Sequence, residues 1–214
     1  MTEVPLLHTA SMRHQIAESL RASVITGEME IGTVYSVPTL AEQFGVSITP
    51  VREAMLDLAN EGLVEPVRNK GFRVRELSAA ELDEILQVRL MLEPAAAAQI
   101  AGKVSKSDVQ QLRKLADAIV DAANSQDLIG YVNNDREFHS FLLELTGNET
   151  LARTVLTLRD QSRLLGLRHL ATQGLLANTT HEHHDMIDAI EAGDAKRASE
   201  IVSAHLGHVR TEWA

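Results

Sequence analysis

The chain has 214 residues, a formal net charge of −10 and no cysteine. The lack of cysteine excludes disulfide bonds and thiolate metal ligands, as expected for a protein of the reducing cytoplasm. No apolar stretch is long enough to span a membrane, and the first residues lack the apolar segment of a signal peptide. The length leaves room for one small domain and one larger domain.

A helix around residues 16–26 is followed, over residues 39–64, by two short helices separated by a turn. Apolar residues recur at helical spacing in both short helices, at Leu40, Ala41, Phe44, Val51, Ala54, Met55 and Leu58. Gly45 can end the first of them, and Ser47 can cap the second. Thr49 and Arg52 then point outward near the start of the second helix, where a recognition helix contacts DNA. The pattern predicts a helix-turn-helix.

A basic β-hairpin is predicted directly after this segment. Residues 65–75 alternate as two strands around a turn at residues 69–71, without an acidic residue between Pro66 and Arg75. Its basic residues are Arg68, Lys70, Arg73 and Arg75. A hairpin beside a helix-turn-helix is a wing, and its basic tip can contact phosphates or enter a minor groove.

From Leu77 onward the sequence is rich in Ala and Leu and has helical periodicity. Capping-box patterns begin at Ser78 and at Ser107, and Asp194 can cap the last helix. Six helices are predicted, over residues 79–102, 107–124, 127–146, 148–168, 174–192 and 194–212. We therefore expect a mainly α protein, with a winged helix-turn-helix over residues 1–76 and an all-α six-helix bundle over residues 77–214.

Four polar residues in this second half lie on otherwise apolar helix faces. Asp135 and His139 are four residues apart on one face, and His183 and His205 lie on apolar faces of the last two helices. A buried carboxylate without a partner is costly, and buried imidazoles need partners too. One divalent cation bound by all four residues would satisfy them, and the donor set suits zinc, nickel or manganese. The alternative is a hydrogen-bond network in the core.

The first half resembles the GntR family of bacterial transcriptional regulators. The matching segments are Gly45-Val46-Ser47, Pro50-Val51-Arg52-Glu53-Ala54, Glu61-Gly62-Leu63-Val64 and Gly71 of the wing. The resemblance implies a DNA-binding surface made of Ser47, Ile48, Thr49, Arg52, Arg68, Lys70, Gly71 and Arg73. Many members carry an arginine where this chain has Ile48, which can only offer an apolar contact to DNA or pack against the turn.

The second half resembles the FCD ligand-binding domain of the FadR branch, and its six helices resemble the VanR-like subgroup. The matching residues are Asp135, Phe138, His139, Thr146-Gly147-Asn148, Glu182, His183, Ala189, Ile190, Asp194 and His205. The resemblance implies a metal held by Asp135, His139, His183 and His205. It also implies that an arginine near the metal binds an effector carboxylate, for which the candidates are Arg89, Arg159 and Arg163. Salt bridges to nearby acids are the alternative role for these arginines.

These features predict a metabolite-responsive transcriptional regulator of the cytoplasm. We expect it to bind a palindromic operator in double-stranded DNA as a homodimer, under the control of a small organic acid near a divalent metal. Repression released by the effector is the commoner mode in the family. Two alternatives remain: a metalloenzyme whose site activates water, and a regulator whose metal is purely structural.

Overall fold

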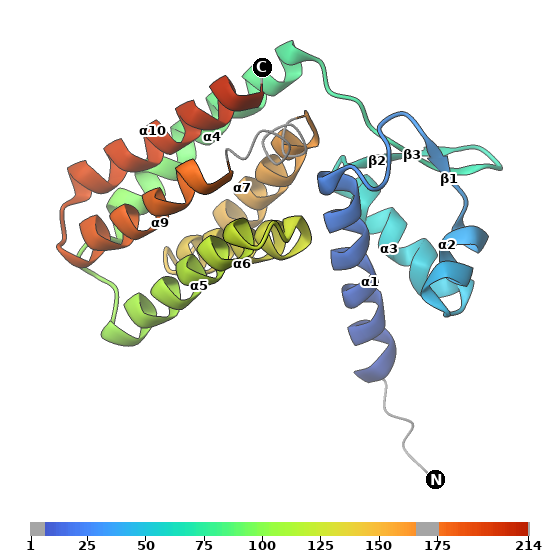
Figure 1. Cartoon of the computed structure of the whole chain (residues 1–214), viewed down its shortest axis with the longest axis horizontal. Coiled ribbons are helices and arrows are strands. Elements are labelled where there is room, and N and C mark those ends of the chain that lie inside the picture. The colour runs from blue at the N-terminus through green and yellow to red at the C-terminus, as the bar shows by residue number, and fades with distance from the viewer. Residues whose placement is uncertain (1–6, 166–175, 214) are drawn as a thin grey trace, which may run out of the picture. The chain divides into compact units, whose positions relative to one another are not determined.

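The computed structural model describes residues 7–165 and 176–213, and the chain divides into two compact units between Glu76 and Leu77 (Figure 1). The elements of the first unit are α1 (Leu7–Thr26), β1 (Val34–Tyr35), α2 (Val37–Phe44), α3 (Ile48–Asn60), β2 (Val64–Val67) and β3 (Gly71–Val74). The strands form an antiparallel sheet of order β1-β3-β2, with Val34 opposite Arg73 and Val64 opposite Val74. The predicted winged helix-turn-helix is confirmed, and β1 is a strand that the sequence pattern did not indicate.

The turn between α2 and α3 follows from its local sequence. Gly45 ends α2 in the left-handed conformation, at φ 65°, and its N–H donates to the carbonyl of Glu42. Ser47 occupies the N-cap position of α3 with an extended backbone, but its side chain makes no capping hydrogen bond. The expected capping role of this hydroxyl is therefore wrong, because the group is not turned toward the N–H groups of the first helical turn.

Two ion pairs and an apolar face join α1 to α3. The apolar positions of α3 predicted from its periodicity are fully buried: Val51, Ala54, Met55 and Leu58. Arg13 on α1 donates two hydrogen bonds to the carboxylate of Asp57. Arg21, which is buried, donates to both carboxylate oxygens of Glu61 at 2.7 and 3.0 Å. These contacts hold α1 against α3.

The described residues of the second unit form helices and short connections, without a strand. Its elements are α4 (Ala79–Ile100), α5 (Lys106–Asn124), α6 (Leu128–Glu144), α7 (Glu149–Ser162), the 3₁₀ turn η1 (Arg163–Leu165), α9 (Leu176–Glu191) and α10 (Ala195–Trp213). The all-helical fold class is confirmed; the helix predicted over residues 148–168 becomes a 3₁₀ turn after Ser162, and residues 166–168 and 174–175 lie outside the described residues. Helix α10 packs against α4 and α9, and α5 packs against α6 and α9 (Figure 1). No helix in the described ranges is both long and apolar enough to cross a membrane.

Side-chain caps set the starts of these helices. The predicted capping box of α4 is present, because Ser78 and Glu81 exchange hydrogen bonds with each other's backbone N–H groups. The box predicted to begin at Ser107 is wrong. The serine two residues earlier, Ser105, forms the box with Asp108 instead, so α5 begins at residue 106. Asp194 accepts a hydrogen bond from the N–H of residue 197 and caps α10 as predicted.

Candidate functional site

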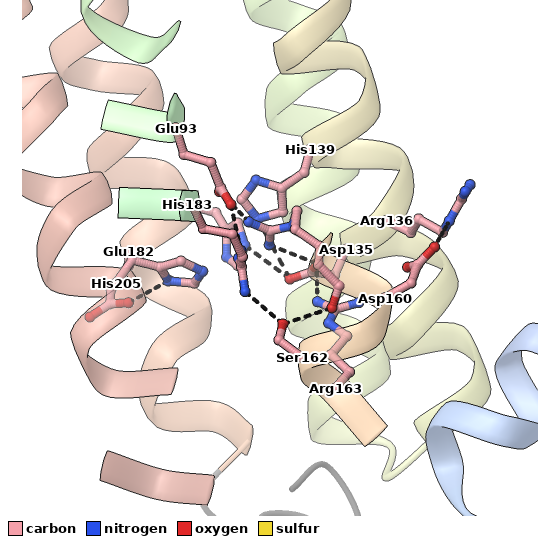
Figure 2. Close-up of polar contacts among 12 residues, drawn as sticks. Glu93, Asp135, Arg136, His139, Asp160, Ser162, Arg163, Glu182, His183 and His205 are labelled. Atoms are coloured by element: carbon pink, nitrogen blue, oxygen red, sulfur yellow. Dashed lines mark hydrogen bonds and ion pairs between the residues drawn. The ribbon is translucent and has the colours of Figure 1, made fainter. Parts of the chain in front are cut away.

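Three buried histidines from three helices meet in the interior of the second unit (Figure 2). They are His139 on α6, His183 on α9 and His205 on α10, and one ligand atom of each lies within 4.8 Å of the others. The Phe138 ring packs nearly perpendicular to the rings of both His139 and His183, with ring centroids 5.0 and 4.8 Å apart. Residues 22 to 66 positions apart in the sequence are thus brought together by inward-facing positions on packed helices.

Asp135 lies beside this histidine cluster, one helical turn before His139. Its Oδ1 atom is 3.3 Å from Nε2 of His183 and 3.8 Å from Nε2 of His139. Both of these Nε2 atoms are buried and lack a hydrogen-bond partner among the described residues. A buried polar atom without a partner is costly, and here two face the same carboxylate oxygen. The residues therefore fit a divalent cation, for which three imidazoles and one carboxylate are a suitable donor set.

Hydrogen bonds on the far side of two rings determine which nitrogen faces the cluster. Nδ1 of His183 lies 3.2 Å from the carbonyl oxygen of Thr180, and Nδ1 of His205 lies 2.7 Å from a carboxylate oxygen of Glu182. A carbonyl and an ionised carboxylate can only accept, so each Nδ1 carries the proton. The Nε2 lone pair of each ring is then available as a metal ligand.

The charge states of Asp135, His139 and His205 at neutral pH are those that a metal ion requires. Burial lowers the pKa of His139 well below its ordinary value, and the charge of Arg159 adds to this. Burial also lowers the pKa of His205. Burial alone would raise the pKa of Asp135, but Arg163, Arg159 and the neighbouring histidines together outweigh it and hold that pKa well below its usual range. The site therefore offers neutral imidazoles at His139 and His205 and an ionised carboxylate at Asp135.

The arginines predicted to bind an effector lie beside the cluster, and acidic side chains occupy all three. Arg163 donates to Oδ2 of Asp135, the oxygen that faces away from the histidines. Arg159 approaches the same oxygen at 3.3 Å and donates to Glu93 at 2.6 Å. Arg159 lies on α7, Arg163 on η1, Asp135 on α6 and Glu93 on α4, and Figure 2 shows Arg163 directed toward Asp135. The structure thus places the arginines in salt bridges, the alternative left open by the sequence.

Glu93 is a buried residue of this site that the sequence patterns did not single out. It accepts a hydrogen bond from Nε of Arg89 at 2.6 Å as well as from Arg159, and Arg89 also donates to Ser162 at 2.8 Å. Burial lowers the pKa of Arg89 to about 10, although the charge of Glu93 opposes the shift. The spacing of Arg89 and Glu93, four residues apart on one helix, is the sequence signal that could have indicated the pair.

The metal-free protein is expected to lose stability as the pH falls below about 6.5. His139 and His205 resist protonation when folded because burial lowers the pKa of each, whereas the unfolded chain protonates them near the ordinary value. The unfolded state then binds more protons, and the free energy of unfolding falls by up to about 1.4 kcal/mol per pH unit for each histidine. Above this range their contribution stays constant. Urea unfolding in the presence of a chelator, repeated over a pH series, measures the slope.

The matched control for this pH dependence is His139→Gln, which removes one of the two titrating groups. Its unfolding free energy should fall less steeply with decreasing pH, and the slope should be smaller by up to about 1.4 kcal/mol per pH unit. A slope equal to that of the unmodified chain would show that His139 does not contribute through protonation.

In the first unit, the start of α3 presents its predicted DNA-binding residues to solvent. Ser47, Thr49 and Arg52 are exposed, and Ile48 is 45% exposed. Nearly half of Ile48 is thus open to a DNA contact, while the rest is covered by the protein. The four side chains form one open surface at the N-terminus of the helix, where backbone N–H groups favour a phosphate.

The wing presents fewer free charges than its sequence suggests. Arg73 pairs with Glu65 across the hairpin at 3.1 Å, and Arg75 donates to the carbonyl of Gly62. Arg68 and Lys70 are exposed at the turn. These two residues are the strongest candidates for phosphate contacts.

Gly71 has a structural role in addition to the DNA contact predicted for it. Its φ is 130°, and a Cβ atom there would lie 2.0 Å from the carbonyl oxygen of Tyr35. Glycine is therefore needed for β1 to approach β3, whether or not its backbone also touches DNA.

Comparison with known proteins agrees with both units. The profile of bacterial regulatory proteins of the gntR family matches residues 12–74, and the FCD domain profile matches residues 84–208. The chain is 27% identical to the HTH-type transcriptional regulator McbR of Escherichia coli over 87% of each chain. The solved structure of McbR superposes with a TM-score of 0.80 and 24% identity, covering 92% of this chain and 94% of that one.

Two further relatives are regulators as well. An HTH-type transcriptional regulator from the ttuE–ttuC' intergenic region of Agrobacterium vitis is 35% identical, over 61% of this chain and 75% of its own length. A protein of Paenarthrobacter nicotinovorans named "Probable D-xylose utilization operon transcriptional repressor" is 26% identical, over 94% of this chain and 88% of its own length. The chain therefore belongs to the gntR family of bacterial regulatory proteins, in the branch that carries an FCD domain, and it is a transcriptional regulator rather than an enzyme.

Proposed function

We propose that this regulator binds a palindromic operator as a homodimer in the cytoplasm, and that a small organic acid controls it by binding at or beside a divalent metal. The metal would be zinc, nickel or manganese, held by Asp135, His139, His183 and His205. The observation that carries the proposal is the buried cluster of three histidines, two of which have Nε2 atoms without a hydrogen-bond partner in the described chain. A metal-binding domain on a DNA-binding unit is suited to sensing.

The DNA half of the proposal rests on the exposed start of α3 and the tip of the wing. Arg52 supplies the guanidinium that can read guanine, and Ile48 can contact a thymine methyl group. Arg68 and Lys70 supply charge for phosphates. Two recognition helices related by two-fold symmetry match two inverted half-sites, so a dimer of this chain calls for a palindromic operator.

An exposed apolar stripe on α4 supports the homodimer. Met91 is 72% exposed and Val88 is 41% exposed, one helical turn apart, and Ala95 continues the stripe. Exposed apolar side chains that adjoin one another mark interaction surfaces. We propose that a second copy of the chain covers this face of α4.

The charges around the metal site support an acidic effector. Arg89, Arg159 and Arg163 are already paired with Glu93 and Asp135. When bound, the cation would supply a Lewis-acidic positive charge that a carboxylate can bind. Arg159 and Arg163 both contact Oδ2 of Asp135, the oxygen that faces away from the histidines. A shift of this carboxylate would free them to donate to the effector. Such an effector would change operator affinity by binding one arrangement of the dimer better than another.

Replacing Arg52 with alanine is expected to weaken operator binding by about 1–3 kcal/mol and to relax base preference at one position of each half-site. Replacing Lys70 with alanine should instead weaken binding to all duplexes about equally and reduce its salt dependence. Fluorescence anisotropy with an operator selected from random duplexes, at several salt concentrations, measures both effects. If the Arg52→Ala protein bound the operator with the same affinity as the unmodified chain, the proposed docking would be overturned.

Metal and effector are tested together by screening small organic acids against the metal-loaded protein for thermal stabilisation. An acid that stabilises the protein should change operator affinity, and it should lose both effects after chelation although the chelated protein still binds operator. A chelated protein that responds normally would leave the metal a structural role. The proposed regulation would be contradicted if none of the acids that stabilise the metal-loaded protein changed its operator affinity.

A further inference from the structure

Glu182 lies next to a proposed metal ligand in sequence, yet its side chain is directed to the neighbouring helix. From α9, its Oε2 atom accepts a hydrogen bond from Nδ1 of His205 on α10, at 2.7 Å. Its Oε1 atom lies 2.6 Å from Nδ1 of His208, one turn further along α10. Figure 2 shows the carboxylate of Glu182 on the side of the His205 ring away from the other histidines. One acidic side chain thus joins the helices that carry two of the three histidines.

This hydrogen bond constrains His205 in two ways. The carboxylate accepts the Nδ1 proton, which leaves Nε2 as the nitrogen with a free lone pair. It also fixes the rotation of the ring about its bond to Cβ, so that Nε2 stays on the side of His139 and His183, whose ring centroids are 5.7 and 5.2 Å from that of His205. A negatively charged acceptor further raises the basicity of the imidazole as a ligand.

The partners of Glu182 differ from those of the other carboxylates drawn around the site. Glu93 is paired with Arg89, Asp135 with Arg163, and Asp160 with Arg136. The contacts of Glu182 in the same network are both with imidazoles, and its side chain is 19% exposed. Among the described side chains, no guanidinium pairs with this carboxylate, and its negative charge acts on His205.

We propose that Glu182 is a positioning residue of the metal centre. It holds His205 in the tautomer and ring orientation in which Nε2 can coordinate the ion. This proposal rests on the proposed metal function. Glu182 does not touch the ion, and His208 takes part only as a second, exposed partner of the same carboxylate.

The test measures the affinity of the full chain for Zn²⁺ after stripping with a chelator, by competition with a chromophoric chelator. Glu182→Ala should bind Zn²⁺ about 10–100-fold more weakly than the unmodified chain. Glu182→Gln keeps an oxygen that can accept the Nδ1 proton of His205, so it should recover most of this loss. The visible spectrum of the Co²⁺-loaded protein, which reports coordination geometry, should change in Glu182→Ala and be largely restored in Glu182→Gln.

The chain offers a matched control on the same helix. His184 and Asp117 form another histidine–carboxylate contact between helices, at 2.9 Å, away from the cluster. Asp117→Asn should bind Zn²⁺ as the unmodified chain does. His208→Ala should also do so, because it leaves the contact between Glu182 and His205 in place.

Three results would overturn the positioning role: a Glu182→Ala protein that binds Zn²⁺ normally, a Glu182→Gln protein as weak as Glu182→Ala, or a His208→Ala protein as weak as Glu182→Ala. The last would show that Glu182 acts by joining α9 to α10 and not through His205. An unmodified chain that binds neither Zn²⁺ nor Co²⁺ would instead overturn the metal site itself, so the two failures are distinguishable.

Discussion

His183→Ala protein is expected to retain almost none of the divalent ion that the unmodified chain carries, at close to one ion per chain. His183 is fully buried and contributes one of three imidazoles to the cluster, with its Nε2 atom 3.3 Å from Oδ1 of Asp135. The variant should also lose the stabilisation that the ion provides, which is about 4 kcal/mol when the free metal is a thousandfold above its Kd. Elemental analysis of gently purified protein and urea unfolding with and without Zn²⁺ measure the two effects.

The next residue provides the control for this substitution. His184 is half-buried on the same helix, and it contacts the exposed carboxylate of Asp117 instead of the cluster. His184→Ala should keep the ion and its stabilisation by Zn²⁺. A His183→Ala protein that retains a full equivalent would remove His183 from the ligand set. An unmodified chain that never carries metal would reduce the four residues to a hydrogen-bond network in the core.

Arg159→Met is expected to destabilise the metal-free protein by about 3–5 kcal/mol. The guanidinium is buried and shared by two buried carboxylates, with Nη1 2.6 Å from Glu93 and Nη2 3.3 Å from Asp135. Removing it leaves both acids with one guanidinium fewer in an interior that solvates charge poorly, and methionine fills much of the volume without replacing the hydrogen bonds. Urea unfolding in the presence of a chelator measures the loss.

Arg113 is a matched control, because it also contacts two carboxylates. Its Nη2 atom lies 2.7 Å from Asp188 and 2.8 Å from Glu191, but all three side chains are exposed. Exposed ion pairs contribute little, so Arg113→Met should cost less than about 1 kcal/mol. Equal losses in the two variants would show that burial does not determine the contribution of Arg159.

Much of the fold follows from local patterns in the sequence. The turn at Gly45, the caps at Ser78 and Asp194, and the inward faces of the helices each depend on residues within a few positions of one another. The same holds for the positions of Asp135 and His139, because helical periodicity alone places them together on an apolar face. Where the structure differs from the local pattern, the difference is small: the capping box of α5 begins at Ser105, two residues before the predicted serine.

The sequence by itself determined which faces of the helices turn inward, and therefore that three histidines and Asp135 are buried. Only the tertiary structure decided their partners. Arg159 meets Glu93 from a position 66 residues later in the chain, and Glu182 meets His205 from the neighbouring helix. Periodicity specifies which side of a helix is buried but not which helix packs against it or in what register. The physical reason is that local propensities act over one or two turns, whereas ion pairs and metal ligands depend on packing between helices distant in sequence.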